Sequence, residues 1–403
     1  MQPRVWGSDR VAMLAHTCYL RDPRVRREAE VLAEQGIEVH VISLSERREA
    51  AEGREARHVV VNGVEIHRLP VTKNRGSSLR YLYEYCVVGV LGGLKLAQLR
   101  FRGKLNVVHI HNMPDALVFA ALIPKMDGSK VVLDVHDPMP ELYMSRKRGR
   151  FSRLLVGILR AQESASFRFA DWIISVNESM RENLKAKRVP EEKIVIVHNF
   201  PDEQLFPVCD IPRTWPRTRD SLVLLYCGTV TEQYDVALAI KAIARLANEI
   251  PVKLRLLGDG NKLSEVLNLA RLLGVGNSVE YIGVVPIDGV REEMKKADIG
   301  ISCHRAGIFG DLYFSTKIVE YLTQGLPVLS SRTYTINRYL PEDCLFYFEP
   351  GSDVALAEAI RLMWSNKAEV MARLIRARDR LPDLSWQAEK RKLLAFYSEL
   401  LRQ

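Results

Sequence analysis

The chain has 403 residues, too many for one ordinary domain and enough for two of about 200 residues each. Apolar residues (47%) and charged residues (27%) occur in the usual proportions of a soluble globular protein. The formal charge of +9 comes from residues 1–200, which carry 32 Lys/Arg and 23 Asp/Glu, whereas the rest carries 26 of each. The first half therefore either meets an anionic partner or has a solubilising basic surface.

The six cysteines are scattered and form no C-x-x-C pair, which favours a reducing cytosol over a disulfide or zinc framework. The N-terminus lacks a signal-peptide pattern, and no apolar run reaches the roughly 18–20 residues of a membrane span. We therefore expect a cytoplasmic protein, either free or peripheral on the cytoplasmic face of the membrane.

Short apolar strands alternate with helical patterns through the first half. Residues 11–15 and 39–44 flank a helix over 24–35, which Gly36 ends, so they form one β–α–β unit. A small hairpin is predicted around Asn62-Gly63. Further strands are predicted at 106–110, 130–135, 172–176 and 194–197.

A proline-broken segment, 201–221, is interpreted as a linker, and a second series of strands follows it. These strands are predicted at 222–227, 252–257, 279–282, 298–302, 326–330 and 345–348. Two successive series predict an α/β fold with two doubly wound parallel-sheet, Rossmann-like domains facing a cleft. The expected boundaries are 1–205, 206–385 and a C-terminal helix, 386–403, that can pack back on the N-terminal domain.

The segment 78–102 has more apolar residues than a helix with one buried face requires, and basic residues flank it. This pattern predicts either an interfacial membrane helix or a helix buried between sheet and linker. The basic run at 146–148 would contact anionic head groups in the first case, and is a solvated face in the second.

A polar turn, a short helix and an apolar strand follow one another over residues 314–328. Ser315 and Thr316 can cap the start of the helix, where free backbone N–H groups favour an anion. Lys317 adds a cation there, and Glu320, one turn later, can accept hydrogen bonds from hydroxyl groups. A diphosphate with vicinal hydroxyls describes a nucleotide sugar.

Two glycine turns follow strands of the same predicted sheet, at Gly228-Thr229 and at Leu257-Gly258. Glycine at the end of a strand lets the backbone approach a ligand closely, although ordinary turns need glycine as well. Their position at strand carboxyl ends, together with the helix at 317–320, predicts a ligand site at that edge.

These motifs, in this order, resemble the GT-B glycosyltransferases, specifically the large retaining family 4. The resemblance includes His109-x-His111-Asn112-x-Pro114-Asp115 in the first half and Lys317–Val328 in the second. The other matching segments are 21–29, 32–39, 133–141, 197–201, the Gly228 turn, 257–260, 281–283 and 297–300. The resemblance covers nearly the whole chain and implies a first domain that binds the acceptor and a second that binds the nucleotide sugar.

The family's carboxylate pair, E-x7-E, is only half present. Its second member aligns with Glu320, which the resemblance implies holds the ribose hydroxyls. Its first member falls on Leu312, and Asp311 is the nearest substitute. Ser315 stands in place of the glycine whose backbone amide faces the donor sugar. The chain therefore resembles a divergent branch of the family.

Both cations that usually follow the first glycine turn are missing. They fall on Thr229 and Tyr234. The charge of the diphosphate would then be met by Lys317, by Arg305 and by helix N-termini.

On the acceptor side, His136 aligns with the family's active-site histidine and would position donor or acceptor, or else hold its own loop. Asp137 and Glu141 would orient this histidine or bind the acceptor. A place in the same cleft or a structural role is expected for Asp22, His111, Asn112 and Asp115.

We expect neither a metal nor a cofactor. Asp134 and His136 are expected on opposite faces of their strand, and no other metal-ligand spacing is found. The dinucleotide motif G-x-G-x-x-G does not follow the first strand of either half.

The predicted function is transfer of a sugar from a UDP- or GDP-sugar to an acceptor hydroxyl, with the retention implied by the resemblance. The enzyme would be of hexosyl- or N-acetylhexosaminyl-transferase type. A lipid-linked or polysaccharide-precursor acceptor at an anionic membrane surface suits the basic first half, and no nucleic-acid partner is expected. Two alternatives stay open: a nucleotide-sugar 2-epimerase on the same fold, and a nucleotide-sugar-binding scaffold.

Overall fold

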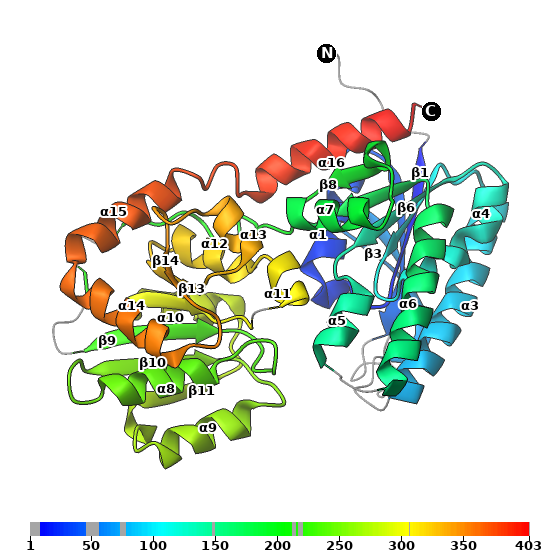
Figure 1. Ribbon diagram of the computed structural model, residues 1–403. Coiled ribbons are helices and arrows are strands. Elements are labelled where there is room, and N and C mark those ends of the chain that lie inside the picture. The colour runs from blue at the N-terminus through cyan, green and yellow to red at the C-terminus, as the bar shows by residue number, and fades with distance from the viewer. Residues whose placement is uncertain are drawn as a thin grey trace. The chain divides into compact units, whose positions relative to one another are not determined.

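The computed structural model describes most of the chain, and the described residues are 9–45, 56–72, 78–146, 150–211, 215–216, 221–305 and 307–402. The chain divides into two compact units (Figure 1). The first unit contains the described residues up to His198 and those from Glu389 onward, and the second contains Asn199–Ala388.

The first unit is built on an eight-stranded sheet in the order β3-β4-β2-β1-β5-β6-β7-β8. Its strands are β1 (Arg10–Ala15), β2 (Glu38–Ser45), β3 (His58–Val61), β4 (Val64–Thr72), β5 (Val107–His111), β6 (Lys130–Val135), β7 (Trp172–Ser175) and β8 (Ile194–Ile196). All neighbouring pairs are parallel except β3 and β4. The inner strands β1, β5 and β6 are almost entirely buried, as expected for a sheet covered on both faces.

The antiparallel pair β3–β4 is the hairpin predicted from the sequence. Its turn residues Asn62 and Gly63 have φ angles of 49° and 80°, the left-handed values that a two-residue hairpin turn requires. Asparagine and glycine tolerate this conformation better than other residues do.

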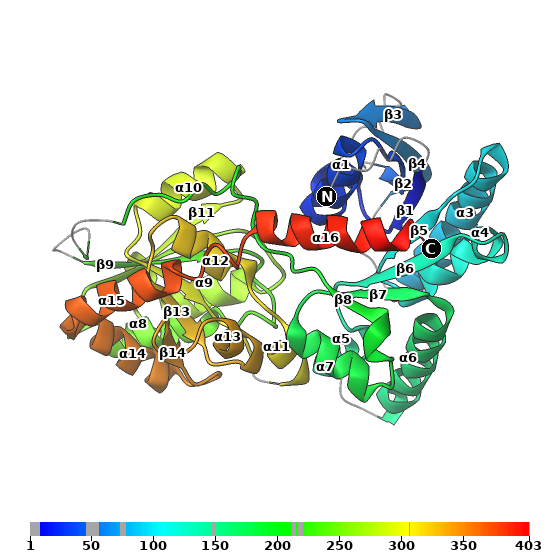
Figure 2. The ribbon, with the colours of Figure 1, turned by 90° about the horizontal axis from the view of Figure 1, so that it is seen from above.

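Helices and 3-10 turns complete this unit. They are α1 (Pro23–Glu34), α3 (Ser78–Arg102), α4 (Leu122–Met126), α5 (Met139–Arg146), α6 (Arg150–Phe169), α7 (Glu178–Ala186) and α16 (Trp386–Leu400), with 3-10 turns η1 (Tyr19–Arg21), η2 (Asp115–Ala121) and η3 (Glu191–Lys193). The helices α3 and α4 lie side by side (Figure 2), and η2 packs against both α3 and α6. From Glu389 onward α16 belongs to this unit, and it buries the ring of Tyr397 completely.

The second unit has six strands in the order β11-β10-β9-β12-β13-β14, all parallel. They are β9 (Leu222–Cys227), β10 (Val252–Leu257), β11 (Val279–Gly283), β12 (Ile299–Ser302), β13 (Val328–Ser331) and β14 (Phe346–Phe348). Its helices are α8 (Ala237–Leu246), α9 (Leu263–Leu272), α10 (Ile287–Lys295), α11 (Ile308–Leu312), α12 (Thr316–Thr323), α13 (Tyr334–Tyr339), α14 (Asp353–Ser365) and α15 (Lys367–Arg378), with the 3-10 turn η4 (Gly276–Ser278).

The strand orders confirm the predicted fold class, two parallel-sheet α/β domains. In each sheet the order reverses at one point, between β1 and β5 in the first unit and between β9 and β12 in the second. Parallel sheets of this kind bind ligands beyond the carboxyl ends of the strands at such a point. The two regions where a ligand is expected are therefore the strand ends around β5 and β6 and those around β9 and β12.

Candidate functional site

In the second unit, Lys317 lies directly against the glycine turn that follows β9. A Cβ atom on Gly228 would lie 2.2 Å from Cε and 2.8 Å from Nζ of Lys317. Gly228 also has a φ of 145°, which L side chains rarely adopt. Glycine is therefore needed at this position for the lysine to reach the strand end.

The second glycine turn, at Gly258, packs against the first, at Gly228. A Cβ on Gly258 would lie 2.0 Å from the carbonyl oxygen of Gly228, so the two backbones are in direct contact. The amide of Gly228 donates to the carbonyl of Leu257 (2.9 Å), and the amide of Gly258 donates to the carbonyl of Gly283 (2.8 Å). Gly258 thus holds the turn on which Lys317 rests.

Tyr234 contacts the lysine from another side. Its ring centroid lies 5.1 Å from Nζ of Lys317, within the range of a cation–π contact. The ring of His304 packs edge-on against Tyr234 with the centroids 5.4 Å apart. Burial, and then the charge of Lys317, lower the pKa of His304 to about 3, so this imidazole is neutral. Tyr234 stands where the family resemblance implies a cation, and its ring instead positions Lys317.

Glu320 lies one turn into α12, on the same side as Lys317. Burial raises the pKa of Glu320, while Lys317 and a hydrogen bond from Thr316 oppose that rise. The nearby thiol of Cys227 has its pKa raised to about 11 by burial and by the charge of Glu320. The start of α12 thus presents a cation and a carboxyl group three residues apart beside the glycine turn.

The side-chain cap predicted at the start of α12 is not formed. Ser315 is the N-cap residue, but its side chain makes no capping hydrogen bond. The residue is fully buried, and its hydroxyl has no hydrogen-bond partner among the described residues. Thr316 bonds to Glu320 instead. The prediction was wrong because the side chain of Ser315 is enclosed by its surroundings, away from the amides of the first turn.

Arg305 and Asp311 are engaged by other groups. Arg305 forms ion pairs with Glu232 (3.0 Å) and Asp235 (3.6 Å). A carboxylate oxygen of Asp311 accepts a hydrogen bond from the amide of Tyr334 (3.2 Å) at the start of α13. Thr229 is exposed, and its carbonyl accepts a hydrogen bond from Tyr226 (2.7 Å). The predicted donor-site residues that the structure brings together are Gly228, Gly258, Lys317, Thr316 and Glu320.

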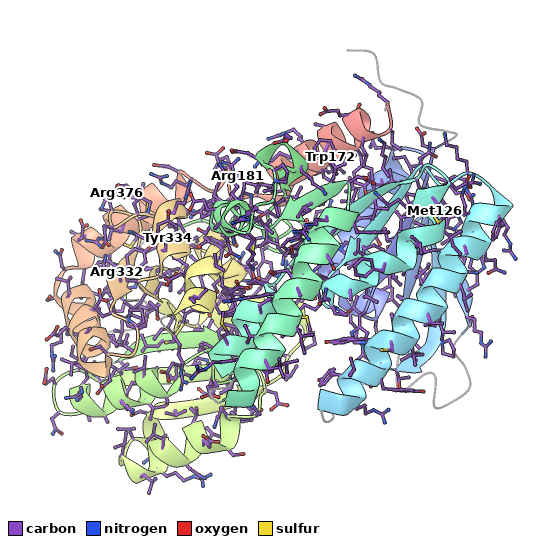
Figure 3. The ribbon with its side chains drawn as sticks, turned by 45° about the vertical axis from the view of Figure 1, so that its right-hand side comes forward. Met126, Trp172, Arg181, Arg332, Tyr334 and Arg376 are labelled. Atoms are coloured by element: carbon purple, nitrogen blue, oxygen red, sulfur yellow. The ribbon has the colours of Figure 1, made fainter. Side chains whose placement is uncertain are left out.

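A cavity of about 550 Å³ lies beside the same sheet edge, where β13 leads into α13. Its lining residues are Arg332, Thr333, Tyr334, Asn337 and Arg338, and Figure 3 shows Arg332 and Tyr334 together on this surface. Thr333 Oγ1 and Asn337 Oδ1 are buried there without a hydrogen-bond partner among the described residues. Sequence analysis missed this cavity; the only available signal was the pair of arginines that follows the strand.

In the first unit, a buried ion pair lies at the ends of β5 and β6. Arg24 donates to both carboxylate oxygens of Asp134, from Nε at 2.9 Å and from Nη2 at 2.7 Å. The same carboxylate lies 2.9 Å from Nε2 of His136 and 3.2 Å from Nδ1 of His111. The prediction that Asp134 and His136 lie on opposite faces was wrong, because residues two apart along a strand share a face.

The rest of this cluster was also missed by sequence analysis. Glu28 lies 3.2 Å from Arg24, and burial raises the pKa of this carboxyl group. His109 bonds to the hydroxyl of Tyr397 (2.8 Å), and burial lowers its pKa well below the ordinary value. The charged residue Asp134 within an apolar, buried strand was the available signal, since such a group needs a partner nearby.

Asn112 joins the loops that follow β5 and β6. Its side-chain oxygen accepts from the amide of His136 (2.8 Å), and its amide nitrogen donates to Asp115 (2.8 Å) and to the carbonyl of Asp137 (2.8 Å). Asn112 is therefore a positioning residue for His136, whose ring remains 22% exposed.

Two predicted acceptor-side residues have structural partners. Glu141 pairs with Lys187 (2.9 Å), which also binds Glu163 (2.7 Å). Asp22 caps α1 by accepting from the amides of Arg24 (3.2 Å) and Val25 (3.3 Å). The carboxylate that contacts the ring of His136 belongs to Asp134, which sequence analysis had not assigned to this role.

Asp115 should make the stability of the protein depend on pH. Burial raises the pKa of Asp115 to about 6, so the folded protein holds this proton after the unfolded chain has lost it. The free energy of unfolding should therefore fall as the pH rises from about 4 to about 6. Asp115→Asn should remove this loss. Between pH 4 and neutral pH, the free energy of unfolding of the variant should therefore rise relative to that of the wild type by up to about 3 kcal/mol. Urea unfolding of the wild type and the variant across this pH range checks this prediction. If their free energies of unfolding change with pH in parallel, the prediction is wrong.

Comparison with known families identifies both units. Residues 24–205 match the model of "Glycosyltransferase Family 4", and residues 210–380 match that of "Glycosyl transferases group 1". This chain belongs to the group 1 glycosyltransferases of family 4. The resemblance predicted from the sequence is thereby confirmed.

Individual relatives are distant in sequence. The chain is 23% identical to N-acetyl-alpha-D-glucosaminyl L-malate synthase of Bacillus anthracis, over 70% of this chain and 71% of that enzyme. It is 25% identical to chitobiosyldiphosphodolichol beta-mannosyltransferase of Debaryomyces hansenii, over 66% of this chain but only 61% of that enzyme. The structure of Anabaena HepE in complex with UDP-glucose superposes with a TM-score of 0.69 at 13% identity, covering 96% of this chain and 99% of HepE. The fold of this glycosyltransferase is GT-B.

Proposed function

We propose that this glycosyltransferase transfers a hexosyl or N-acetylhexosaminyl group from a UDP- or GDP-sugar to an acceptor hydroxyl, with retention at the anomeric carbon. The observation that carries the proposal is the contact of Lys317 with Gly228, with Glu320 one turn further along α12. The complex of HepE with UDP-glucose supports a donor of this class.

The chemistry follows from where charge develops during transfer. Negative charge grows on the leaving diphosphate, and Lys317 together with the free amides at the start of α12 would stabilise it. Glu320 in its ionised form would accept hydrogen bonds from the ribose hydroxyls. These groups can stabilise the diphosphate without a metal ion, so we propose that transfer is metal-independent.

His136 would meet the acceptor or the donor sugar. Its ring is partly exposed, and Asp134 orients it from the buried side. A histidine with one nitrogen bound to a carboxylate can use the other to bind or deprotonate a hydroxyl group. Asp137, which follows it directly, is partly exposed as well and is the second candidate on this side.

We further propose a lipid-linked or polysaccharide-precursor acceptor, reached at the anionic cytoplasmic surface of a membrane. No helix in the described parts of the chain is long and apolar enough to cross a membrane. Yet α3 leaves large apolar side chains exposed, and η2, α4 and α6 add more. These residues are Leu82, Tyr83, Val90, Leu94 and Phe101 on α3, Phe119, Leu122, Ile123 and Met126 on η2 and α4, and Leu154, Leu155 and Ile158 on α6. Residues 147–148 of the predicted basic run lie outside the described residues.

Membrane binding through α3 can be tested directly. Leu94 and Phe101 are 62% and 80% exposed, so their replacement by glutamate should not disturb the core. Leu94→Glu/Phe101→Glu should weaken sedimentation with vesicles containing phosphatidylglycerol by about tenfold or more, because two apolar contacts are lost. The control is Leu272→Glu, a residue 83% exposed on α9, which should sediment like the wild type. Equal sedimentation of all three proteins would contradict membrane binding through α3.

The donor is tested by a thermal-shift panel of UDP-, GDP-, ADP- and dTDP-sugars without added metal. One base should raise the melting temperature selectively. The variant Glu320→Gln should show little of this rise in melting temperature. Its neutral amide accepts weaker hydrogen bonds from the ribose hydroxyls than an ionised carboxylate does. If no nucleotide sugar changes the melting temperature of the wild type, the proposed donor site is wrong.

A further inference from the structure

Three histidines and one glutamate meet at the edge of the first sheet, away from the strand ends described above. His40 is on β2, His58 on β3, and Glu65 and His67 are on β4. The register places His40 beside Glu65 and His58 beside His67. Glu65 and His67 are two residues apart on one strand, so all four side chains lie on the same face of the sheet.

Three of these side chains, those of His40, Glu65 and His67, converge on one small volume. Oε2 of Glu65 lies 3.2 Å from Nδ1 of His40 and 3.9 Å from Nε2 of His67, and Nδ1 of His40 lies 3.3 Å from Nε2 of His67. Ligands about 2.0–2.1 Å from a tetrahedral zinc ion are separated from one another by about 3.3 Å, so the spacings among these three groups are close to those of such a site. His58 lies beside the cluster: its Nε2 is 3.2 Å from Oε2 of Glu65, and its ring stacks on that of His67.

The surroundings prepare His40 to act as a ligand. Nε2 of His40 lies 2.8 Å from Oε1 of Glu38, which also accepts a hydrogen bond from Nε of Arg10 (2.8 Å). Nη2 of Arg10 also lies 3.0 Å from Nε2 of His40. In the tautomer in which Nε2 donates its proton to Glu38, the lone pair of Nδ1 points toward Glu65 and His67. A metal-binding histidine usually has a carboxylate partner of this kind on its other nitrogen.

The cluster is reached from one side. His40 and His67 are buried, whereas the side chain of His58 is 52% exposed, which leaves the ion a route of entry.

We propose that His40, Glu65 and His67 bind one divalent transition-metal ion of the zinc type. The three ligands come from β2 and β4, so the ion would fasten the edge hairpin β3–β4 to β2 and leave a fourth coordination position open. This ion would take no part in sugar transfer, and the proposal does not depend on the function proposed above.

A second cluster, Glu28, His109, His111 and Asp134, also brings possible ligand atoms together. There the guanidinium of Arg24 already binds both carboxylates, at 2.7 Å from Asp134 and 3.2 Å from Glu28. A metal ion would have to compete with a buried cation for the same oxygens. In the cluster on the edge hairpin, the contacts of Glu65 at 3.2–3.9 Å are with the histidines themselves.

The test uses the untagged full chain, stripped with EDTA and returned to chelator-free buffer. Titration with Co2+ should give the visible absorption of a four-coordinate ion at one equivalent, and one equivalent of Zn2+ should abolish it. Zn2+ should also raise the melting temperature. His67→Ala and Glu65→Ala should lose the Co2+ spectrum, whereas His111→Ala, in the second cluster, should keep it. Glu38→Gln should weaken Zn2+ binding about 10- to 100-fold.

Three results would overturn the proposal. They are a wild-type protein without stoichiometric Zn2+ binding, a Co2+ spectrum that survives in Glu65→Ala, and a spectrum lost only in His111→Ala. Because the side chain of Glu65 is 36% exposed, its replacement by alanine should leave the folded core intact and keep the test valid even if His67→Ala fails to fold.

Discussion

Lys317→Met is expected to lower kcat/KM for the donor about 100- to 1000-fold, because it removes the cation closest to the glycine turn that follows β9. Methionine keeps the length of the side chain and its packing on Tyr234 and Gly228, so the loss isolates the charge. In this site Thr229 and Tyr234 replace the two cations that the family resemblance leads one to expect. The remaining lysine should therefore account for more of the transition-state stabilisation than it would in a site with three cations.

The matched control is Lys241→Met, an exposed lysine on α8 in the same unit, which should leave kcat/KM unchanged. Arg338→Met tests the basic cavity beside α13, whose lining includes Arg332 and Arg338. If Arg338→Met lowers kcat/KM as expected for Lys317→Met, and Lys317→Met has no effect, the diphosphate binds beside α13 instead. Steady-state kinetics with varied donor and excess acceptor separate the two outcomes.

The fold could be predicted from the sequence because its signals are local. Strands such as β1 and β6 are short apolar runs, and the turn Asn62-Gly63 specifies a hairpin by its backbone preferences alone. Boundaries were less certain: residues 326–330 predicted a strand, but β13 begins at Val328, because Pro327 has no N–H to donate to a ladder.

The donor side of the site could be partly predicted, because Lys317 and Glu320 lie on one short helix and Gly228 on one turn. The cap at Ser315 failed because the burial of its side chain depends on tertiary packing, which a local pattern does not show. Asp311 was predicted as the nearest substitute for the missing first glutamate of the carboxylate pair. Its hydrogen bond from the amide of Tyr334 could not be predicted, because it depends on the approach of α13.

The clusters of the first unit depend on strand register, which the sequence does not show. His111 lies beside Asp134 because β5 pairs with β6, and His40 lies beside Glu65 because β2 pairs with β4. Shifting either pairing by one residue would turn these side chains to the other face of the sheet. Histidines and carboxylates far apart in sequence can therefore be recognised as partners only after the pairing is known.

Asp134→Ala is expected to destabilise the first unit by about 3–5 kcal/mol, because the buried guanidinium of Arg24 loses both hydrogen bonds to Asp134 and keeps only Glu28, at 3.2 Å, of the two carboxylates. Arg24 is only 3% exposed, so water cannot replace the lost hydrogen bonds. Urea unfolding at neutral pH measures the effect. Glu191→Ala, which removes an exposed pair with Lys185, should leave the unfolding midpoint unchanged.

The double variant Arg24→Met/Asp134→Leu separates the ion pair from the role of Asp134 toward His136. Replacing both charges with apolar groups should recover most of the stability lost in Asp134→Ala, because the buried guanidinium is gone. Glu28, its other partner, can then be protonated, since burial raises the pKa of this carboxyl group. Sugar transfer should stay low in this variant, since His136 has lost the carboxylate 2.9 Å from its Nε2. A double variant as unstable as Asp134→Ala would show that the cost lies in packing rather than in the orphaned charge. Full activity in a restabilised double variant would show that His136 does not need Asp134 to take up its working orientation.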